Sequence, residues 1–314
     1  MHQQSSRPVA LVAGASRGLG LLIARELASR GHDVAICARD EETLRVAAQQ
    51  IGDGLDVRVR HFVCDVRSEQ QVTATVAEVE RELGPVDVAV FVAGVIQVGP
   101  LAALQHHHFR DSIDVMLWGP INLAMAVVPG MVGRGQGRFG VVTSVGARVS
   151  PPRLLPYNTA KFGAAGFTEG LSAELAGTGV TATTIVPGLM RTGSHQRASF
   201  FGDAAKQYAW FGPAASLPLL TMGAERAARI MVDGVLRGKP VVTVSLMSHL
   251  ATRVHGLAPG LTVRLMGVMS RLLPAGTNAQ TVEGLEVRRV GGVVSFLTTL
   301  GDRAAERFNE RRRD

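Results

Sequence analysis

The sequence predicts an α/β fold in which a doubly wound sheet of seven parallel strands has helices on both faces and is followed by a C-terminal helical extension. Three observations lead to this prediction. Short apolar runs alternate with longer helical patterns through residues 1–245, a glycine-rich turn joins the first strand to the first helix, and residues 246–314 hold mainly helical patterns. Strands that alternate with helices form parallel sheets, because right-handed crossovers place the helices over both faces.

Seven apolar or β-branched segments have the length of buried strands. They are residues 9–13, 33–38, 57–64, 86–92, 138–143, 181–186 and 240–245. Six longer segments between them have helical patterning, namely residues 19–30, 40–51, 68–83, 109–131, 157–176 and 224–237. Local end signals agree with this order, since Gly31 is placed to end the first helix and Asp40 to cap the second.

Two regions are expected along the chain. Residues 1–245 form one domain, which a long irregular loop at residues 189–222 interrupts. Residues 246–314 form a helical extension that packs on the same domain. Its first part, residues 246–273, is apolar and rich in methionine with spaced arginines, whereas residues 302–313 are a charged helix that ends in three arginines. The extension is either a helical cap or an amphipathic segment that associates with a surface.

The composition excludes several classes of protein. With 46% hydrophobic and 19% charged residues in 314, the chain is an ordinary packed globular protein and not a disordered one. Two cysteines exclude a disulfide framework, and the absence of zinc-type Cys/His spacing predicts no metal site. The net charge of +7 comes almost entirely from arginine, without a basic stripe interleaved with aromatic residues, so nucleic acid is not an expected partner.

The expected location is cytoplasmic. Residues 1–8 are polar, and no signal peptide is expected there. Residues 115–133 approach the length of a membrane span, but glycines and prolines interrupt them, which favours a buried helix. Cys37 and Cys64 lie in apolar strands and are expected to be free thiols in a reducing compartment.

A phosphate-binding loop follows the first strand. Residues 14–20 contain glycines at positions 14, 18 and 20, a Gly-x3-Gly-x-Gly spacing, and they lead into the first helix. Glycines allow a tight turn and close approach of the backbone to a pyrophosphate, while the helix N-terminus offers free amides. In its place between strand and helix, the loop predicts a Rossmann-like dinucleotide site.

Two arginines favour NADP(H) as the cofactor. The second strand ends at Arg39, where the adenosine ribose of a dinucleotide would lie, and Arg17 lies within the phosphate loop. An acidic residue at the strand end would hold a 2′-hydroxyl, whereas a 2′-phosphate needs a cation. Asp40 is better placed as a helix cap than as the ribose acid.

Tyr157 and Lys161 provide the clearest chemical signal. The chain has only two tyrosines and three lysines, and these two lie four residues apart, on one face of a helix. A cation beside the phenol is expected to lower its pKa and to let it exchange a proton with a carbonyl or alcohol oxygen. Ser144 stands at the end of the fifth strand, where open α/β sheets bind their ligands.

With these motifs, residues 7–245 resemble a single-domain short-chain dehydrogenase/reductase. The resemblance implies that pyrophosphate and ribose are lined by Gly14, Ser16, Arg17, Gly18 and Leu19, and that Arg39 meets the 2′-phosphate. It implies that Asp65 and Val66 hold the adenine and that Ala93 and Gly94 approach the ribose. It further implies that Tyr157 is the acid/base, Ser144 orients the substrate oxygen and Lys161 holds the nicotinamide ribose. The nicotinamide is clamped by Pro187, Gly188 and Thr192.

The chain departs from the family pattern at two places. The family usually has asparagines before the Ala-Gly pair, where this chain has Phe91 and Val92. The family also places an asparagine in the long helix to hold a proton-relay water, and the aligned residue is Met116. A methionine cannot hold that water through an amide, so the relay must use another group or be weakened.

The loop at residues 189–222 is expected to cover the nicotinamide. Five of its residues are aromatic: Phe200, Phe201, Tyr208, Trp210 and Phe211. They either form an apolar cover that selects a hydrophobic substrate or only pack the lid. Methionines of residues 246–273 either widen this pocket or rest on a membrane surface. The run of histidines at 106–108 is expected to be a surface helix start, because consecutive helical positions diverge.

Residues 1–245 are therefore expected to be an NADP-binding catalytic domain that interconverts a ketone or aldehyde and an alcohol on a hydrophobic small molecule. Two alternatives stay open: a catalytically impaired dinucleotide-binding sensor or scaffold, and a reductase of carrier-linked acyl chains. The resemblance also implies a homodimer or homotetramer associated through the helices at residues 109–131 and 157–176. Peripheral membrane contact through residues 246–273 is a further possibility.

Overall fold

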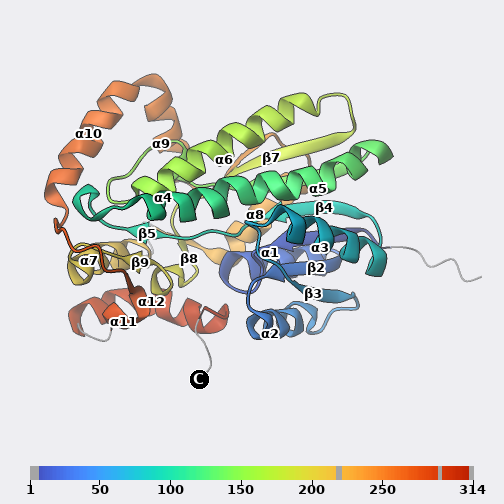
Figure 1. Cartoon of the computed structure of the whole chain (residues 1–314), viewed down its shortest axis with the longest axis horizontal. Coiled ribbons are helices and arrows are strands. Elements are labelled where there is room, and N and C mark those ends of the chain that lie inside the picture. The colour runs from blue at the N-terminus through green and yellow to red at the C-terminus, as the bar shows by residue number, and fades with distance from the viewer. Residues whose placement is uncertain (1–6, 217–220, 289–291, 311–314) are drawn as a thin grey trace, which may run out of the picture.

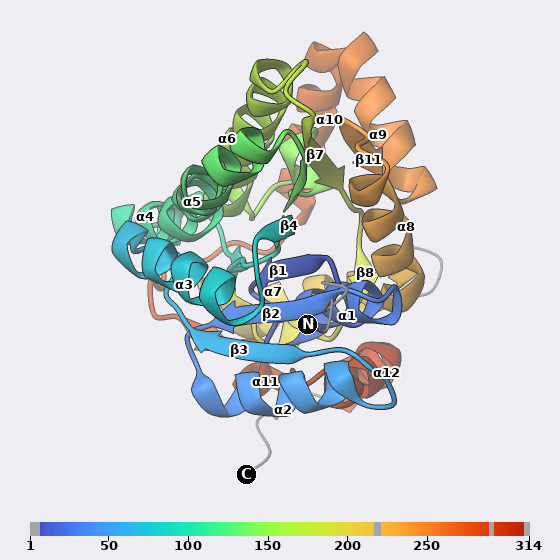
Figure 2. The same ribbon diagram turned by 90° about the vertical axis from the view of Figure 1, so that its right-hand side faces the viewer.

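The computed structural model describes residues 7–216, 221–288 and 292–310. Its centre is a sheet of seven parallel strands in the order β11-β7-β6-β4-β1-β2-β3 (Figures 1 and 2). The strands are β1 (Val9–Ala13), β2 (Asp33–Ala38), β3 (Val59–Val63), β4 (Val86–Phe91), β6 (Gly137–Val142), β7 (Val180–Val186) and β11 (Val241–Thr243). The predicted fold class is confirmed, and the strand order reverses direction between β1 and β4, which is where such sheets bind ligands.

Helices cover the sheet on both faces, and each set encloses its own hydrophobic core. One face carries α1 (Gly18–Ser29), α2 (Glu41–Gly52) and α8 (Ala224–Leu236), with Ile23, Leu44 and Met231 fully buried. The other face carries α3 (Glu69–Glu82), α5 (Gly119–Arg134) and α6 (Leu155–Glu174). Except for α5, the observed ends of these helices lie within about two residues of the predicted ones, because their caps are local. Asp40, for example, accepts the Thr43 amide at 2.9 Å as the predicted N-cap.

The predicted long helix is divided into three consecutive helical segments. They are α4 (His106–Ile113), a π-helical turn at Asp114–Trp118 and α5. Together they are long and apolar enough to cross a membrane, but they pack on the sheet. The Asn122 amide donates to the Val66 carbonyl at 3.0 Å, and Arg134 donates to the Val86 carbonyl at 2.7 Å. The three segments therefore form a core helix of this domain.

The histidine run is only partly a surface feature. It starts α4 as predicted, but His108 is buried and its ring stacks on Phe201 at 4.5 Å. The prediction of a surface run is therefore wrong for His108, because the loop at residues 189–222 folds back over this helix start.

The loop at residues 189–222 is more ordered than the sequence predicts, apart from residues 217–220, which lie outside the described ranges. It contains β8 (Met190–Arg191), β9 (Ser199–Phe200), α7 (Ala204–Ala214) and the first residue of β10 (Met222–Gly223). β8 pairs with β10, while β9 lies between β5 (Gln97–Val98) and β12 (Val282–Glu283) in a small second sheet. The C-terminal region thus contributes a strand to the loop that follows β7.

The C-terminal region divides into two parts on different sides of the molecule. The helices α9 (Leu246–Leu257) and α10 (Pro259–Leu272) form a projecting hairpin, at the upper left of Figure 1. The helices α11 (Gly284–Arg288) and α12 (Gly292–Arg307) lie below α7 in the same view. The helix predicted at residues 302–313 instead begins earlier and ends at Arg307, and its three terminal arginines fall outside the described residues.

Candidate active site

A cavity of about 480 Å³ lies at the carboxyl ends of the central strands. It is lined by every site residue that the sequence predicts except Gly18. These residues come from seven separate stretches of the chain: Gly14, Ser16, Arg17 and Leu19; Arg39; Asp65 and Val66; Ala93 and Gly94; Ser144; Tyr157 and Lys161; Pro187, Gly188 and Thr192. The parallel sheet brings them together because all of its strands end at the same edge.

The glycine loop is a tight cradle that side chains would fill. Gly14 has φ +88°, and a Cβ there would lie 2.4 Å from the backbone nitrogen of Ala93. A Cβ at Gly20 would lie 2.1 Å from the Gly14 carbonyl oxygen. Only glycine fits at these positions, and the loop leads directly into the N-terminus of α1, so this geometry suits a pyrophosphate.

Charged residues surround one end of the cavity. Arg17 precedes α1, Arg39 follows β2 and Asp65 follows β3, and all three line the cavity. Asp65 pairs with Arg67 at 2.5 Å, and this hydrogen-bonded cation holds the pKa of the Asp65 carboxyl below its ordinary value. Arg17 already contacts a carboxylate, that of Glu310, at 3.3 Å. This end therefore holds both cations and carboxylates, and Arg17 and Arg39 are the cations that line it.

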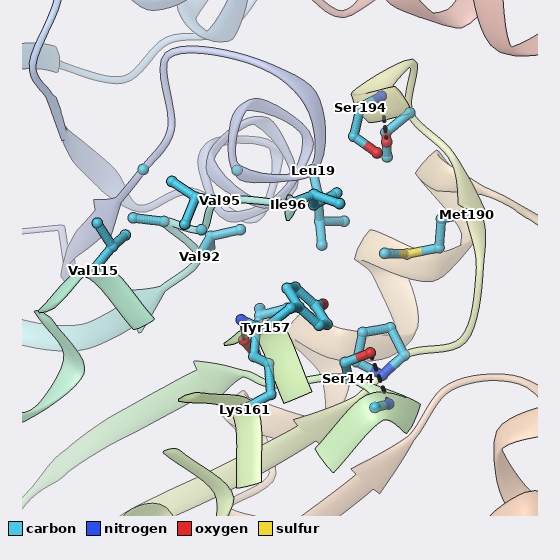
Figure 3. A pocket seen from close by; sticks show the side chains of 18 of the residues that line it. Leu19, Val92, Val95, Ile96, Val115, Ser144, Tyr157, Lys161, Met190 and Ser194 are labelled. Atoms are coloured by element: carbon cyan, nitrogen blue, oxygen red, sulfur yellow. Dashed lines mark hydrogen bonds between the residues drawn. The ribbon is translucent and has the colours of Figure 1, made fainter. Parts of the chain in front are cut away.

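Ser144, Tyr157 and Lys161 lie together elsewhere in the cavity (Figure 3). The Ser144 hydroxyl accepts the Gly146 amide at 3.0 Å and is hydrogen-bonded to the Tyr157 phenol. The Lys161 ammonium lies 5.7 Å from the centre of the Tyr157 ring and donates to the Val142 carbonyl at 2.7 Å. One turn of α6 and the end of β6 thus place a hydroxyl, a phenol and an amine around one space.

Burial, and not the neighbouring cation, dominates the protonation of this group. It raises the pKa of Tyr157, and the hydrogen bond to Ser144 opposes it only in part. Burial also lowers the pKa of Lys161 to about 7. The expected lowering of the phenol pKa is therefore wrong for this structure, because burial of the phenol raises its pKa. Tyr157 keeps its proton at neutral pH.

The wall around Tyr157 is largely apolar. Leu19, Val92, Val95, Ile96, Val115 and Met190 line it in Figure 3. Of the five aromatic residues in the loop, only Trp210 and Phe211 reach the cavity. Phe200, Phe201 and Tyr208 are buried, and Phe200 packs edge-on against Tyr208 and Phe211 at 5.4 and 5.8 Å. The aromatic cluster therefore both packs the loop and covers the cavity. None of the methionines of residues 246–273 lines the cavity.

The residues expected at the nicotinamide end follow β7. The Pro187 carbonyl accepts the Val145 amide at 2.7 Å, which joins this segment to the end of β6. A Cβ at Gly188 would lie 2.6 Å from the Ser245 hydroxyl, so the backbone approaches α9 closely. Thr192 is buried, and its hydroxyl accepts the Ser194 amide at 3.3 Å.

Apolar packing replaces the family's asparagines. Val92 lines the cavity, whereas Phe91 is buried against Gly119, whose Cβ position lies 2.6 Å from the Phe91 ring. Met116 is buried in the π-helical turn, and its sulfur lies 3.4 Å from the Cβ position of Gly94. The Lys161 ammonium lies 3.9 Å from that same Cβ position. Met116 is therefore close to Lys161 without offering it a hydrogen bond.

Asn158 and Glu310 are among the polar lining residues that the sequence did not predict. The Asn158 amide donates to the Pro151 carbonyl at 2.8 Å and to the Ser150 hydroxyl at 3.0 Å, and so fixes the loop before α6. Its position next to Tyr157 was the available signal. Glu310 gives no such signal, because almost 300 residues separate it from the phosphate loop that it contacts.

Comparisons with known proteins agree with this geometry. Residues 8–199 match the family model described as short chain dehydrogenase. A "Putative ketoacyl reductase" of Streptomyces coelicolor is 39% identical over 186 residues, which are 59% of this chain and 71% of the relative. A 3-oxoacyl acyl-carrier-protein reductase of Vibrio cholerae is 34% identical over 184 residues, 59% of this chain and 74% of the relative.

Solved structures agree as well. An actinorhodin polyketide ketoreductase variant with NADPH has a TM-score of 0.67 at 31% identity, covering 78% of this chain and 97% of its own. A gluconate 5-dehydrogenase from Burkholderia cenocepacia with NADP and tartrate has a TM-score of 0.64 at 28% identity, covering 76% and 93%. The chain belongs to the short-chain dehydrogenase family of oxidoreductases.

Proposed function

We propose that the chain is an NADP(H)-dependent reductase that interconverts a ketone or aldehyde and the matching alcohol on a hydrophobic substrate. One observation carries this proposal: Ser144, Tyr157 and Lys161 meet at an apolar part of the same cavity that presents Arg17 and Arg39 to an anion. The relatives solved with NADPH or NADP, and those named ketoacyl reductases, support it.

The cavity fits a nicotinamide dinucleotide. The glycine cradle and the start of α1 would hold the pyrophosphate, Arg39 with Arg17 would hold a 2′-phosphate, and Lys161 would hold the nicotinamide ribose. When bound, the cofactor supplies the hydride. Trp210 and Phe211 cover the same space and would exclude water from the reacting carbon.

Tyr157 would be the proton donor in the direction of reduction. Its pKa is raised, so the phenol holds a proton at neutral pH and can give it to the carbonyl oxygen as negative charge develops there. Ser144 would donate a hydrogen bond to the same oxygen by turning its proton from the Tyr157 phenol to the substrate, while the Gly146 amide continues to occupy one acceptor site of its hydroxyl. In alcohol oxidation the same two groups would act in reverse.

The substrate is proposed to be an apolar ketone. Leu154, Ile96 and Met190 line the cavity, and within the described ranges no lining residue beyond those named above offers a charge for a carboxylate or a sugar. The names of the ketoacyl reductase relatives make β-ketoacyl thioesters the first member of a test panel. Steroid, quinone and aryl ketones complete it.

The test is turnover of this panel with NADPH by the unmodified protein and by Tyr157→Phe. The variant keeps the ring and its packing but removes the proton donor, so kcat for any accepted ketone should fall at least about a hundredfold. The NADPH dissociation constant should change by less than about twofold, since the phenol is not proposed to bind the cofactor tightly. If no ketone is reduced and no matching alcohol is oxidised, the sensor or scaffold alternative replaces this proposal.

A peripheral membrane contact through the α9–α10 hairpin is also proposed. Ten large apolar side chains of the hairpin are exposed, among them Leu257 at 88%, Leu246 at 84% and Leu272 at 82%. Residues 246–282 contain three arginines and no acidic residue. Arg153 ties the hairpin to the rim of the cavity, because it donates to the carbonyls of Ser270 and Leu273 at 3.1 and 3.0 Å. A basic apolar hairpin of this kind suits an anionic lipid surface.

Co-sedimentation with vesicles tests this contact. Binding is expected to vesicles that contain phosphatidylglycerol, and it should weaken in salt and with purely zwitterionic lipid. Leu257→Asp combined with Leu261→Asp should reduce binding at least about tenfold. If the double variant sediments with these vesicles as much as the unmodified protein does, the hairpin does not form the membrane contact. We also predict that the protein is located in the cytoplasm.

A further inference from the structure

The C-terminal tail closes over the phosphate loop. After α12, the Phe308 carbonyl accepts the Gly18 amide at 2.7 Å. The Asn309 amide donates to the Ser16 carbonyl at 2.8 Å and to the Thr43 carbonyl at 3.2 Å. Residues 308–310 thus bridge the start of α1 and the start of α2, and they occupy the Gly18 amide that sequence reasoning assigned to the cofactor.

Glu310 places a buried carboxylate at this point. Its side chain is 6% exposed, and one oxygen lies 3.3 Å from the Arg17 guanidinium. The other oxygen lies 2.4 Å from the Cβ position of Gly18, so the carboxylate packs against the first residue of α1. Glu310 also lines the cavity. The carboxylate therefore stands at one of the two arginines proposed for the 2′-phosphate.

Contacts of α12 and of residues 308–310 hold the tail in this position. In α12, Asp302 accepts from Gln196 at 2.5 Å and from Thr298 at 3.1 Å. A Cβ at Gly193 would lie 2.4 Å from Ala305, so the helix packs closely on the turn before β9. Arg197 from the same turn donates to the Glu310 carbonyl at 2.8 Å. These contacts fix the position of the end of α12 and therefore place Glu310 at the phosphate loop.

Neighbouring charges and burial act in opposite directions on the ionisation of the Glu310 carboxyl. The charged groups on the packed elements are Arg17 before α1, Arg197 with its partner Glu283, Arg39 and Asp40 after β2, His195 paired with Asp302, and Arg307 paired with Glu225. Arg17 and Arg197 favour the ionised carboxylate, whereas burial disfavours it. Burial dominates and raises the pKa of Glu310 to about 7.

We propose that Glu310 is a specificity-determining residue that couples the binding of a 2′-phosphorylated nicotinamide cofactor to uptake of a proton by the tail. The inference rests on the proposed use of NADP(H). An ionised Glu310 competes with the 2′-phosphate for Arg17 and repels it. A protonated Glu310 is uncharged and can donate a hydrogen bond to the phosphate. A cofactor without this phosphate lacks the group that competes with Glu310 for Arg17 and brings only its pyrophosphate to the loop, so its binding depends less on Glu310.

Equilibrium binding of NADPH and NADH, followed by cofactor fluorescence from pH 7 to pH 8.5, tests the coupling. The 2′-phosphate is already almost fully ionised in this range, since phosphate monoesters have a second pKa near about 6. For the unmodified protein, the NADPH dissociation constant should rise by close to tenfold per pH unit, as one coupled proton requires. The NADH constant should rise clearly less steeply over the same range, because both cofactors bring the pyrophosphate and the ribose bound by Lys161 but only NADPH brings the 2′-phosphate.

Glu310→Gln should reduce the slope for NADPH to that for NADH and tighten NADPH binding at pH 8.5 by at least about tenfold. Glu306→Gln is the matched control, because it removes an exposed carboxylate one turn earlier on α12 and should leave the slope unchanged. Calorimetry at about pH 8, in two buffers of different ionisation enthalpy, should show about one proton more taken up with NADPH than with NADH.

Two results would overturn the inference, and they differ. Tight NADPH binding by Glu310→Gln with the slope of the unmodified protein, or an equal slope for NADH, refutes the role of Glu310 alone. Failure of every variant and of the unmodified protein to bind either nucleotide refutes the proposed function, and the role of Glu310 with it.

Discussion

The amine of Lys161 is buried at 4% exposure, and its one described hydrogen bond is to the Val142 carbonyl. Its pKa of about 7 in the folded protein lies below the ordinary value of 10.5 for an unfolded chain. Between these two values the folded state binds fewer protons than the unfolded state, so stability rises with pH in this window. Below pH 7 the protein must bury a charged ammonium, and the contribution of Lys161 to stability is lowest.

Lys161→Met removes this titration while keeping the length of the side chain. Without cofactor, the variant should gain melting temperature relative to the unmodified protein at pH 6, and the gain should shrink toward pH 9. Thermal denaturation at both pH values measures the difference. Lys239→Met, at an exposed position, should show no such trend. An equal gain at pH 6 and pH 9 would falsify the buried-ammonium account.

Arg39 is expected to determine the preference for NADPH over NADH. It lines the cavity at the end of β2, and the chain is expected to bind NADPH more tightly than NADH. Arg39→Asp replaces the cation by a repelling charge, and one charge-assisted contact contributes about 1.5–3 kcal/mol. The preference for NADPH should therefore fall at least about tenfold, as measured by the dissociation constants of both nucleotides. Equal binding of the two by the unmodified protein would remove the basis for this assignment.

At the scale of elements, the π-helical turn at Asp114–Trp118 sets the position of Met116. The turn directs a buried thioether toward Gly94 and Lys161, where the family resemblance places an amide that holds a relay water. Met116→Asn restores that amide beside Lys161. We expect the variant to keep or raise kcat for an accepted ketone, because the amide can hold a water that the thioether cannot.

Met116→Leu is the control for packing, since it preserves volume and polarity and should retain near-normal turnover. Loss of activity in Met116→Asn with normal activity in Met116→Leu would mean that the site needs an apolar residue here. The proposed relay would then have to run through another group.

The elements of the central sheet could be predicted because their signals are local. β1, for example, is buried along its whole length and therefore appears in the sequence as one continuous apolar run. The site residues could be placed because most of them follow such strands or lie within one turn of a helix. β5, β9 and β12 could not be predicted, because two-residue strands have no period and pair with segments about 80–100 residues away.

Glu310 illustrates the same limit within the site. Its effect depends on the docking of α12, which in turn depends on the buried contacts of Asp302 with Gln196 and Thr298. No spacing in the sequence connects these residues to the phosphate loop. The pKa of Tyr157 could not be predicted for a related reason, since the spacing to Lys161 shows proximity but not the burial that outweighs it.

At the scale of the whole molecule, two separate apolar surfaces are exposed. One is the α9–α10 hairpin. The other lies on α6 and on α5 with the π-helical turn before it, and exposes Met125 at 70%, Trp118 at 53% and Phe162 at 41%. The helices α5 and α6 are neighbours in Figures 1 and 2. Large exposed apolar patches mark contacts with other molecules. The resemblance to the family assigns subunit association to the second surface and leaves the hairpin free for lipid.

This division can be tested by size-exclusion chromatography with light scattering. The unmodified protein should be a dimer or tetramer at micromolar concentration. Met125→Glu combined with Phe162→Glu places two charges on the α5–α6 surface, which would be buried without partners in the complex, so the variant should shift to monomers. Leu257→Glu on the hairpin should leave the assembly intact. If Leu257→Glu dissociates the protein and the double variant does not, the hairpin is the subunit interface, and its proposed lipid contact must be abandoned with it, because one surface cannot be buried against both.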